Sequence, residues 1–385
     1  MNQQFPLEAT ACLDRDTKVR EVRSVIIDAP TTRRHRLSNT EISHQSFVHV
    51  QVTLENGVIG HGEASTLGGP RWAEESVEAI KANIDTYLAP ALIGHPASHV
   101  EAASLRMAKA SKRNYSAKAA LDAALVDALG RTLNLPASVL MGGAVRDRIS
   151  VIWALASGDA EQECEEARAK IAARQFNRFK IKLGFAEPAL DLARIRALRD
   201  ALPEAELVVD VNQAWSEAQA IRFLPALEEL NITLVEQPIA ASQLEGMARI
   251  AARTRIPVML DECCFTSEET FRAASCGAGT VLSLKLVKSG GMHEMKRAAG
   301  IASAAGIELY GGCLLESSLG AAAHLAVFST LPALEWGCEH FGPQIMVQDT
   351  VSDPLVFEDF HVMVPQGPGL GVTPDQDRIR EMARA

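Results

Sequence analysis

RFKIKLG, residues 178–184, reads as a short apolar strand that carries Lys180 and Lys182, and four similar segments follow it along the chain. Each of the four also ends in charge: LVVDVNQ (207–213) at Asp210, TLVEQP (233–238) at Glu236, VMLDE (258–262) at Asp261 and LSLKLVKSGG (282–291) at Lys285. A charged side chain is costly to bury unless it is paired or binds a metal. The regular series therefore indicates a metal site flanked by bases at the ends of these strands.

The five segments belong to a longer repeat of strands and helices. Strand-like runs centre near residues 152, 181, 209, 235, 259, 284, 309 and 335, and helical stretches such as PALDLARIRALRDAL separate them. A strand-helix unit that recurs every 24 to 29 residues predicts a parallel α/β barrel of eight strands, with catalytic groups at the carboxyl ends of the strands. The charged residues fall where this fold places an active site.

The remainder of the chain predicts a second domain. Residues 19–145 contain alternating strands around an Asn56-Gly57 turn, followed by helices, and this pattern is typical of an α+β domain. We expect a disordered extension over 1–18, a capping domain over 19–145, the barrel over 146–342 and a C-terminal segment over 343–385 that returns to the capping domain. A capping domain at the barrel mouth can supply lid loops for a substrate.

Composition limits the functional class. The chain has 385 residues and 47% hydrophobic residues, which favours a globular enzyme of more than one domain. The net charge of −10 argues against a nucleic-acid surface, although a metal and lysines can still bind an anion locally. Seven cysteines without a regular framework, and no recognisable signal peptide or membrane span, favour the cytoplasm and no membrane partner.

Three carboxylates at matching strand ends indicate a cation site. Asp210, Glu236 and Asp261 offer hard oxygen ligands, which suit Mg²⁺ or Mn²⁺, and lack the Cys and His that zinc favours. Asn212, two residues past Asp210, is expected to face the same side and to help as a ligand or hydrogen-bond donor. The alternative is that the three acids belong to scattered salt bridges.

Lysines flank the predicted cation site on two sides. Lys180 and Lys182 lie two apart on one strand, and Lys285 comes from a strand four units farther along the chain. This arrangement suits proton transfer at the carbon next to a metal-bound carboxylate. Desolvation and neighbouring cations are expected to lower the lysine pKa values toward the working range. The alternative, a solvated surface lysine, is favoured for Lys288.

These motifs give the chain a resemblance to a known family. FKIKLG, VDVNQAW, VEQP, LDE and LKLVKSGG resemble the enolase superfamily, and YGGCLLESSLG, GEASTLGGP, WALASGD and WGCEHFGP resemble its muconate cycloisomerase subgroup. The resemblance covers nearly the whole chain. It implies a modified (β/α)₇β barrel, TIM-like, with an α+β capping domain, a Mn²⁺ or Mg²⁺ cofactor and a homo-oligomer, commonly an octamer.

The resemblance also implies roles for individual residues. Asp210, Glu236 and Asp261 match the metal ligands, Lys182 the acid/base, Lys180 its electrostatic helper, Lys285 the opposite-face lysine and Glu316 a carboxylate at the substrate site. The implied reaction is lactonisation of the dicarboxylate cis,cis-muconate, in which the enolate stabilised by the metal is protonated on carbon. Lys182 is the expected donor in syn addition, with Lys285 as the alternative.

Other activities remain open. A racemase of N-acylated amino acids or a dipeptide epimerase would use the same two lysines, but no clear acidic recognition motif follows the eighth strand. A dehydratase of the mandelate racemase type needs a His-Asp pair in place of Lys285, so the sequence excludes it. A non-catalytic binding protein would have lost site residues, and none is missing here.

The sequence departs from the family pattern in the lid. GEASTLGGP, which contains Leu67, continues into Arg71 and Trp72, and the other lid loop contains His44. We expect these four residues at the substrate, where the charge of Arg71 and His44 favours a muconate with an additional anionic or polar group, such as a chloro- or sulfo-muconate. His340, where a relative has an apolar residue, adds to this expectation.

Overall fold

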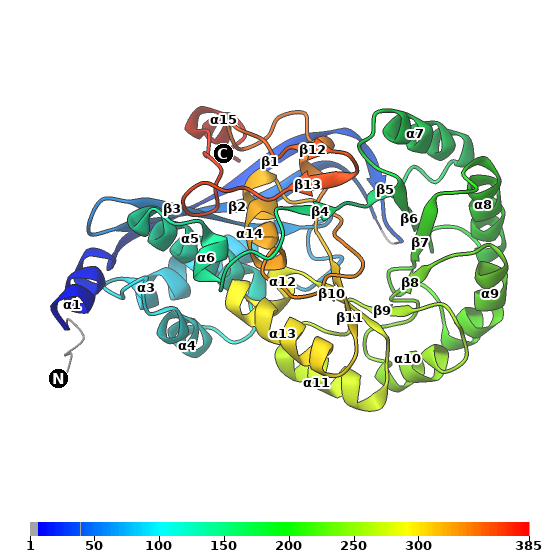
Figure 1. The fold of residues 1–385 in the computed structure, drawn as a ribbon, viewed down its shortest axis with the longest axis horizontal. Helices are drawn as coiled ribbons and strands as arrows, with labels where there is room; N and C mark the ends of the chain where they lie inside the picture. Colours follow the sequence, from blue (N-terminus) through cyan, green and yellow to red (C-terminus); the bar gives the residue numbers. More distant parts are fainter. Residues whose placement is uncertain (1–6, 39, 385) are drawn as a thin grey trace.

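Seven parallel strands and the helices outside them build the predicted barrel (Figure 1). The computed structural model describes residues 7–38 and 40–384. The strands, joined in the order β11-β10-β9-β8-β7-β6-β5, are β5 (Trp153–Leu155), β6 (Arg178–Lys182), β7 (Glu206–Asp210), β8 (Leu234–Glu236), β9 (Val258–Leu260), β10 (Val281–Leu284) and β11 (Glu308–Gly311). The helices between and after them are α7 (Ala160–Ala172), α8 (Pro188–Ala201), α9 (Glu217–Glu229), α10 (Leu244–Ala251), α11 (Ser267–Cys276), α12 (Leu286–Ser289), α13 (Met292–Ala304) and α14 (Ser318–Phe328).

The eighth strand predicted near residue 335 does not form as a regular strand. Cys338 instead makes single parallel bridges to Val151 on one side and to Gly311 on the other, and these bridges close the barrel. Gly337 has a φ of +65°, a left-handed conformation that cannot belong to an extended strand. The segment 336–339, called the barrel seam below, is therefore irregular, although backbone hydrogen bonds join it to β11 and to residues 150–152.

Apolar side chains fill the barrel interior below the charged strand ends. A separate buried cluster contains Ile152, Val208, Leu234, Met259, Val281 and Tyr310, which come from different positions around the barrel. Such layers make the centre of an α/β barrel a packed core rather than a pore. A substrate can therefore enter only at the rim where the charged residues lie.

The N-terminal part forms the expected capping domain. Its antiparallel sheet has the order β1-β2-β3, with β1 (Val19–Arg36), β2 (Glu41–Leu54) and β3 (Ile59–Thr66). Helices α2 (Val77–Asn83), α3 (Ala89–Leu92), α4 (Val100–Ala110), α5 (Tyr115–Leu133) and α6 (Ala137–Leu140), with the π-helical turn η1 (Ile84–Leu88), follow. The buried, alanine-rich α5 packs so closely on β3 that a Cβ at Gly62 would lie 2.0 Å from the Ala120 carbonyl oxygen.

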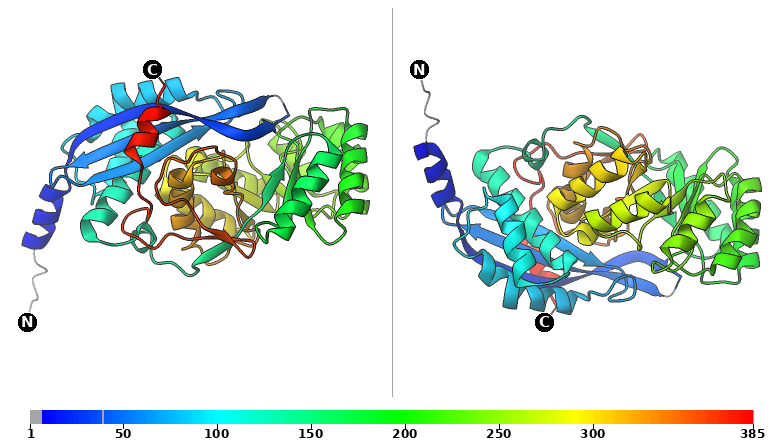
Figure 2. Two further views of the ribbon diagram at one scale, coloured as in Figure 1. Left: turned by 90° about the horizontal axis from the view of Figure 1, so that it is seen from above. Right: turned by 90° about the horizontal axis from the view of Figure 1, so that it is seen from below.

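The C-terminal segment returns to the capping domain. After η2 (Gly342–Gln344), the strand β12 (Phe357–Glu358) pairs with β13 (His361–Met363), which pairs with β4 (Arg148–Ser150), and α15 (Gln376–Glu381) is the last described helix. Figure 2 shows α15 lying across the long strands of the capping sheet. Ile379 and Met382 join Ile27, Ala29 and Phe47 in a second buried cluster, so the tail completes the domain.

The N-terminal extension differs from its prediction. Leu7–Asp16 forms helix α1, because LEATACLDRD is rich in residues that favour helices. Residues 1–6 lie outside the described part of the chain. Among the described helices, none is long and apolar enough to cross a membrane.

Candidate active site

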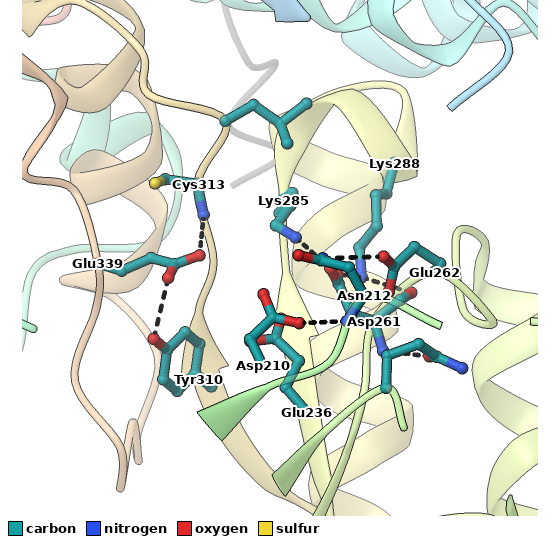
Figure 3. A network of polar contacts seen from close by, with 12 residues as sticks. Asp210, Asn212, Glu236, Asp261, Glu262, Lys285, Lys288, Tyr310, Cys313 and Glu339 are labelled. Atoms are coloured by element: carbon teal, nitrogen blue, oxygen red, sulfur yellow. Dashed lines mark hydrogen bonds and ion pairs between the residues drawn. The ribbon is translucent and has the colours of Figure 1, made fainter. Parts of the chain in front are cut away.

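The parallel register places three charged residues side by side on adjacent strands. Lys182 of β6 is paired in register with Asp210 of β7, and Asp210 is paired with Glu236 of β8. Asp261 follows directly after β9, the next strand of the sheet. All four side chains are buried, and Figure 3 shows Asp210, Glu236 and Asp261 converging at the carboxyl ends of their strands.

Each predicted catalytic lysine contacts a different predicted metal ligand. Lys182 Nζ lies 2.5 Å from Asp210 Oδ2, and Lys285 Nζ forms an ion pair with Asp261 Oδ2. Lys285 reaches this position because Gly312 leaves room: a Cβ there would lie 2.7 Å from Lys285 Cε. Since β6 and β10 are separated in the sheet by β7, β8 and β9, the two ammonium groups approach the carboxylates from different sides.

Lys180 bridges two carboxylates beneath the site. Its Nζ lies 2.5 Å from Glu236 Oε2 and also forms an ion pair with Glu339 Oε2. Glu339 in turn accepts hydrogen bonds from Tyr310 Oη, at 3.1 Å, and from the Cys313 backbone N–H, at 2.9 Å. These contacts fix the Lys180 ammonium group below the predicted cation position, as expected for an electrostatic helper.

The buried carboxylates hold the lysines in their charged form. Burial is the largest single influence and would lower the pKa of Lys285, but Asp261 and the other nearby carboxylates together outweigh it and raise the pKa. The pKa of Lys182 is raised in the same way. Burial would lower it, and Asp210, with smaller contributions from Glu339 and Glu236, raises it. The expectation that lysine pKa values fall is therefore wrong for this arrangement, because several carboxylates together exceed the effect of burial.

Lys288 is a component of the network rather than a surface lysine. It is buried, and its Nζ lies 2.8 Å from Asp261 Oδ1 and 3.0 Å from the Asp261 carbonyl oxygen. No pattern in the sequence distinguishes it from an exposed lysine, because it lies beyond the end of β10, in the short helix α12. Asp261 thus contacts two ammonium groups.

Side chains of the strand-end motifs orient the acids. Gln237 Oε1, from VEQP, accepts the Asp261 N–H at 3.0 Å. Asn212 was expected on β7, but β7 ends at Asp210 and Asn212 has a φ of +43°. Its N–H donates to Asp210 Oδ1 at 2.9 Å and its Nδ2 to Glu262 Oε1 at 3.2 Å, so it positions two carboxylates. Burial raises the pKa of Glu262 to about 7.

The three acids fit a hard divalent cation. Within the described part of the chain, neither oxygen of buried Glu236 has a hydrogen-bond partner apart from its ion pair with Lys180. Burial, and then the adjacent Asp210 carboxylate, raise the pKa of Glu236 well above its ordinary value, so the charged form needs a further positive charge. Carboxylate oxygens alone are the ligands preferred by Mg²⁺ and Mn²⁺.

The lid segment after β3 reaches the site through Trp72. The Lys285 ammonium nitrogen lies 4.5 Å from the centre of the Trp72 ring. Trp72 also stacks on Phe265, with ring centres 5.8 Å apart. The aromatic pair covers Lys285 and can restrict access of water to it.

The other predicted lid residues lie farther from the charged network. Leu67 is buried in the main core. Arg71 is exposed, and its Nη1 donates to Thr40 Oγ1 at 2.9 Å. His44 is exposed on β2, whereas its neighbour Gln45 is buried and donates to the Leu314 carbonyl oxygen at 2.7 Å. Arg71 and His44 line one surface pocket, so a substrate contact for either of them stays a prediction.

Glu316 lies in a different set of contacts from the lysines. Both of its oxygens accept the Leu314 N–H, at 2.9 and 3.0 Å, and Oε1 also accepts from Ser65 Oγ at 3.2 Å. The side chain therefore shapes the loop between β11 and α14 and ties it to β3. The acid that contacts the lysine network at this side of the barrel is Glu339, which the sequence reasoning did not single out.

A signal for Glu339 was present in the sequence. It closes the barrel seam in WGCEHFGP, just as Asp210 and Glu236 close their strands. The rule that charged residues at barrel strand ends face the site would have identified it. The prediction placed the eighth strand near residue 335 and did not extend the rule to its end.

Two family models match the chain in succession. Residues 21–142 match the mandelate racemase / muconate lactonizing enzyme N-terminal domain, and residues 162–378 match the enolase C-terminal domain-like family.

Individual relatives cover nearly the whole chain. Muconate cycloisomerase 1 of Pseudomonas putida is 42% identical over 369 residues, which are 95% of this chain and 98% of that protein. A chloromuconate cycloisomerase of Cupriavidus necator is also 42% identical, over 96% of this chain and all (100%) of that protein. The crystal structure of muconate lactonizing enzyme from Pseudomonas fluorescens complexed with muconolactone superposes with a TM-score of 0.95 at 40% identity, covering 96% of this chain and 100% of that chain.

Proposed function

Because the chain belongs to the mandelate racemase / muconate lactonizing enzyme family of the enolase superfamily, we propose that it is a divalent-metal-dependent cycloisomerase that lactonises cis,cis-muconate or a substituted muconate. The observation that supports this most directly is the pairing of Lys182 with Asp210 and of Lys285 with Asp261. Two ammonium groups thus flank one set of hard oxygen ligands, as proton transfer next to a carboxylate requires.

The balance of charge in the network favours an anionic substrate. Four lysines, Lys180, Lys182, Lys285 and Lys288, contact acids of a set formed by Asp210, Glu236, Asp261 and Glu339, with Glu262 linked to it through Asn212. Positive and negative charges are therefore nearly equal. A bound Mn²⁺ or Mg²⁺, held by Asp210, Glu236 and Asp261, would supply the excess positive charge that opposes charge developing on a substrate carboxylate.

The protein side chains would then position and protonate the substrate. One muconate carboxylate oxygen bonds to the distal double bond, and the carbon next to the other carboxylate takes up a proton, so each turnover consumes one proton. Lys182 would deliver that proton, while Lys285 would hold positive charge on the other face. Lys180, fixed between Glu236 and Glu339, would supply a second positive charge near Lys182. Trp72 would exclude water from Lys285.

A spectroscopic screen tests this function. Purified protein with Mn²⁺ should remove the ultraviolet absorbance of the conjugated diene of muconate or of a chloro- or sulfo-muconate. Lys182→Met should lower kcat by at least ~10²-fold, since a positioned proton donor contributes about that much. The exposed Lys112 supplies the control, because Lys112→Ala should leave the rate unchanged. Absence of turnover with every muconate would refute the proposal.

The second candidate is racemisation of an N-acylated amino acid or a dipeptide. The same observation favours it, because two lysines on different sides of a substrate carbon can exchange its proton between faces. N-succinyl amino acids in the same screen, followed by exchange of the α-proton in D₂O, decide between the two activities.

Assembly and location also remain proposals. The family resemblance favours a homo-octamer, which sedimentation velocity can measure. All seven cysteines are free in the structure, and this is in keeping with a reducing cytoplasm.

A further inference from the structure

Three potential metal ligands that the proposed reaction does not use meet at the barrel seam. Glu316 comes from the loop after β11, His324 from α14, and His340 directly follows Glu339 of the seam. One ligand atom from each lies within 4.8 Å of the others. The three side chains are only 2%, 2% and 1% exposed, so they are not a chance grouping on the surface.

Hydrogen bonds fix the state of His324. The Leu286 N–H donates to His324 Nε2 at 3.0 Å, and only an unprotonated nitrogen can accept it. Nδ1 therefore carries the proton and donates it to the Gly320 carbonyl oxygen at 2.8 Å. An Nδ1–H held by a carbonyl is the arrangement that metal-binding histidines use, and here the Leu286 N–H occupies the Nε2 lone pair that an ion would take.

His340 is a buried imidazole without a hydrogen bond. Among the described residues, neither Nδ1 nor Nε2 has a partner. Its ring lies against His324, at 4.4 Å between centres, and against Phe328, at 5.5 Å. Its Nε2 is 3.8 Å from Glu316 Oε2, which is too long for a hydrogen bond. Buried polar groups are rarely left unpartnered, and capacity to bind an ion is one physical explanation.

Glu316 retains the capacity to bind a cation. Oε2 accepts one hydrogen bond, from the Leu314 N–H, and a carboxylate oxygen has two lone pairs. Glu316 Oε1 lies 4.0 Å from His324 Nε2. Ligand atoms in a tetrahedral zinc site, with metal bonds of about 2.0–2.1 Å, are roughly 3.4 Å apart, so atoms that lie within 4.8 Å of one another would approach by at most about 1.4 Å.

We propose that Glu316, His324 and His340 form a second cation site, separate from the carboxylate set, that binds an imidazole-preferring divalent ion such as Zn²⁺ or Co²⁺. The donor set decides the class of ion, because two imidazoles and a carboxylate suit Zn²⁺ and Co²⁺, whereas Mg²⁺ and Mn²⁺ prefer oxygen ligands. The bound ion links the barrel seam to α14 and to the loop after β11.

Binding at this site has a consequence for the neighbouring active site. His324 Nε2 must exchange the Leu286 N–H for the ion, and Leu286 directly follows Lys285. His340 directly follows Glu339, which holds Lys180. Occupancy of the second site therefore releases the backbone next to Lys285 from His324 and ties the residue next to Glu339 to the ion, while the carboxylate site keeps its own ligands.

Titration with Co²⁺ tests the proposal. Metal-free protein is first saturated with excess Mg²⁺ to occupy the carboxylate site, and Co²⁺ is then added. One further equivalent of Co²⁺ per chain should bind with the strong visible absorption of a four-coordinate ion. His340→Leu should abolish this absorption, and His340→Cys should restore binding with a sulfur-to-cobalt charge-transfer band, which only direct ligation produces.

Two controls separate this site from the carboxylate site and from misfolding. His44→Leu removes an exposed imidazole outside the cluster and should leave the second equivalent unchanged. Glu236→Gln should weaken the Mg²⁺ and Mn²⁺ site but keep the Co²⁺ absorption, so the second site and the proposed reaction can fail independently. Absence of the absorption in the unaltered protein, or its persistence in a folded His340→Leu variant, would overturn the proposal.

Discussion

Replacing Glu236 with glutamine should remove most of the stability that Mn²⁺ gives to the folded protein. Glu236 is buried between Asp210 and Asp261, and apart from the ion pair with Lys180 neither of its oxygens has a hydrogen-bond partner in the described structure. Glutamine keeps the shape of the side chain but loses the charge that binds the cation. Lys180 keeps its ion pair with Glu339, so the metal-free protein should change little in stability.

The size of the effect follows from linkage between binding and folding. At free Mn²⁺ of 100 times its dissociation constant, the unaltered protein gains about 2.7 kcal/mol in free energy of unfolding. Loss of a residue that binds the metal directly should weaken Mn²⁺ binding by at least ~100-fold. This is the upper end of the loss in metal affinity when a residue that only hydrogen-bonds to a metal ligand is replaced. At the same Mn²⁺ concentration the variant would then gain only about 0.4 kcal/mol.

Urea unfolding with and without Mn²⁺ measures this difference. For a slope of about 3 kcal/mol/M, Mn²⁺ should raise the midpoint by ~0.9 M in the unaltered protein and by ~0.1 M in Glu236→Gln. Glu75→Gln is the matched control, because Glu75 is a largely buried acid outside the site whose carboxylate accepts the Ser116 N–H at 2.9 Å. An equal Mn²⁺-dependent shift in Glu236→Gln and the unaltered protein would refute the ligand assignment.

Three further outcomes test other residues. In D₂O, deuterium should be added on the same face of the product as the ring oxygen. Lys285→Ala should keep this stereochemistry, whereas Lys182→Ala should stop turnover. If NMR finds the deuterium on the opposite face, Lys285 is the proton donor. Arg71→Ala should raise KM at least ~10-fold for a muconate with an additional anionic group and barely change KM for unsubstituted muconate, because a hydrogen bond to a charged group contributes about 1.5–3 kcal/mol. Equal changes for both substrates in steady-state assays would make Arg71, which is exposed, a surface charge only. Burial lowers the pKa of His49 to about 4. Below about pH 6.5, His49 is therefore protonated in the unfolded chain but stays neutral in the folded chain until the pH reaches about 4. The free energy of unfolding should therefore fall between pH 6.5 and 4, and urea titrations of His49→Leu should show a smaller fall.

The barrel and its charged rim could be predicted because they follow from short periodic signals. Each strand is a run of apolar residues, and each charge lies at the same place relative to the run, so Asp210 and Glu236 could be aligned before their register was known. Parallel strands in a barrel share one carboxyl edge. Residues that reach the site from the end of a strand can therefore be predicted from the sequence.

Residues that depend on turns and on distant segments could not be predicted in this way. Lys288 reaches Asp261 because the chain turns into α12 directly after Lys285, and nothing in LKLVKSGG distinguishes it from a solvated lysine. Asn212 was expected to continue the alternation of β7, but it has a left-handed backbone. The alternation of residues along a strand cannot predict a backbone conformation that contacts with distant segments impose.

The barrel seam is the clearest case in which a residue of the lysine network lies where the local sequence does not predict a strand. Gly337 breaks the extended backbone there, so strand propensity is weak at the place where Glu339 must reach Lys180. The seam is positioned instead by bridges to Val151 and Gly311 from both neighbours, and those neighbours are set only when the barrel closes. Glu339 therefore acquires its position from the whole barrel, whereas Asp210 acquires its position from its own strand. For the same reason the partners of His340 could be identified only from the folded structure, because α14 and the loop after β11 lie next to the seam only in the closed barrel.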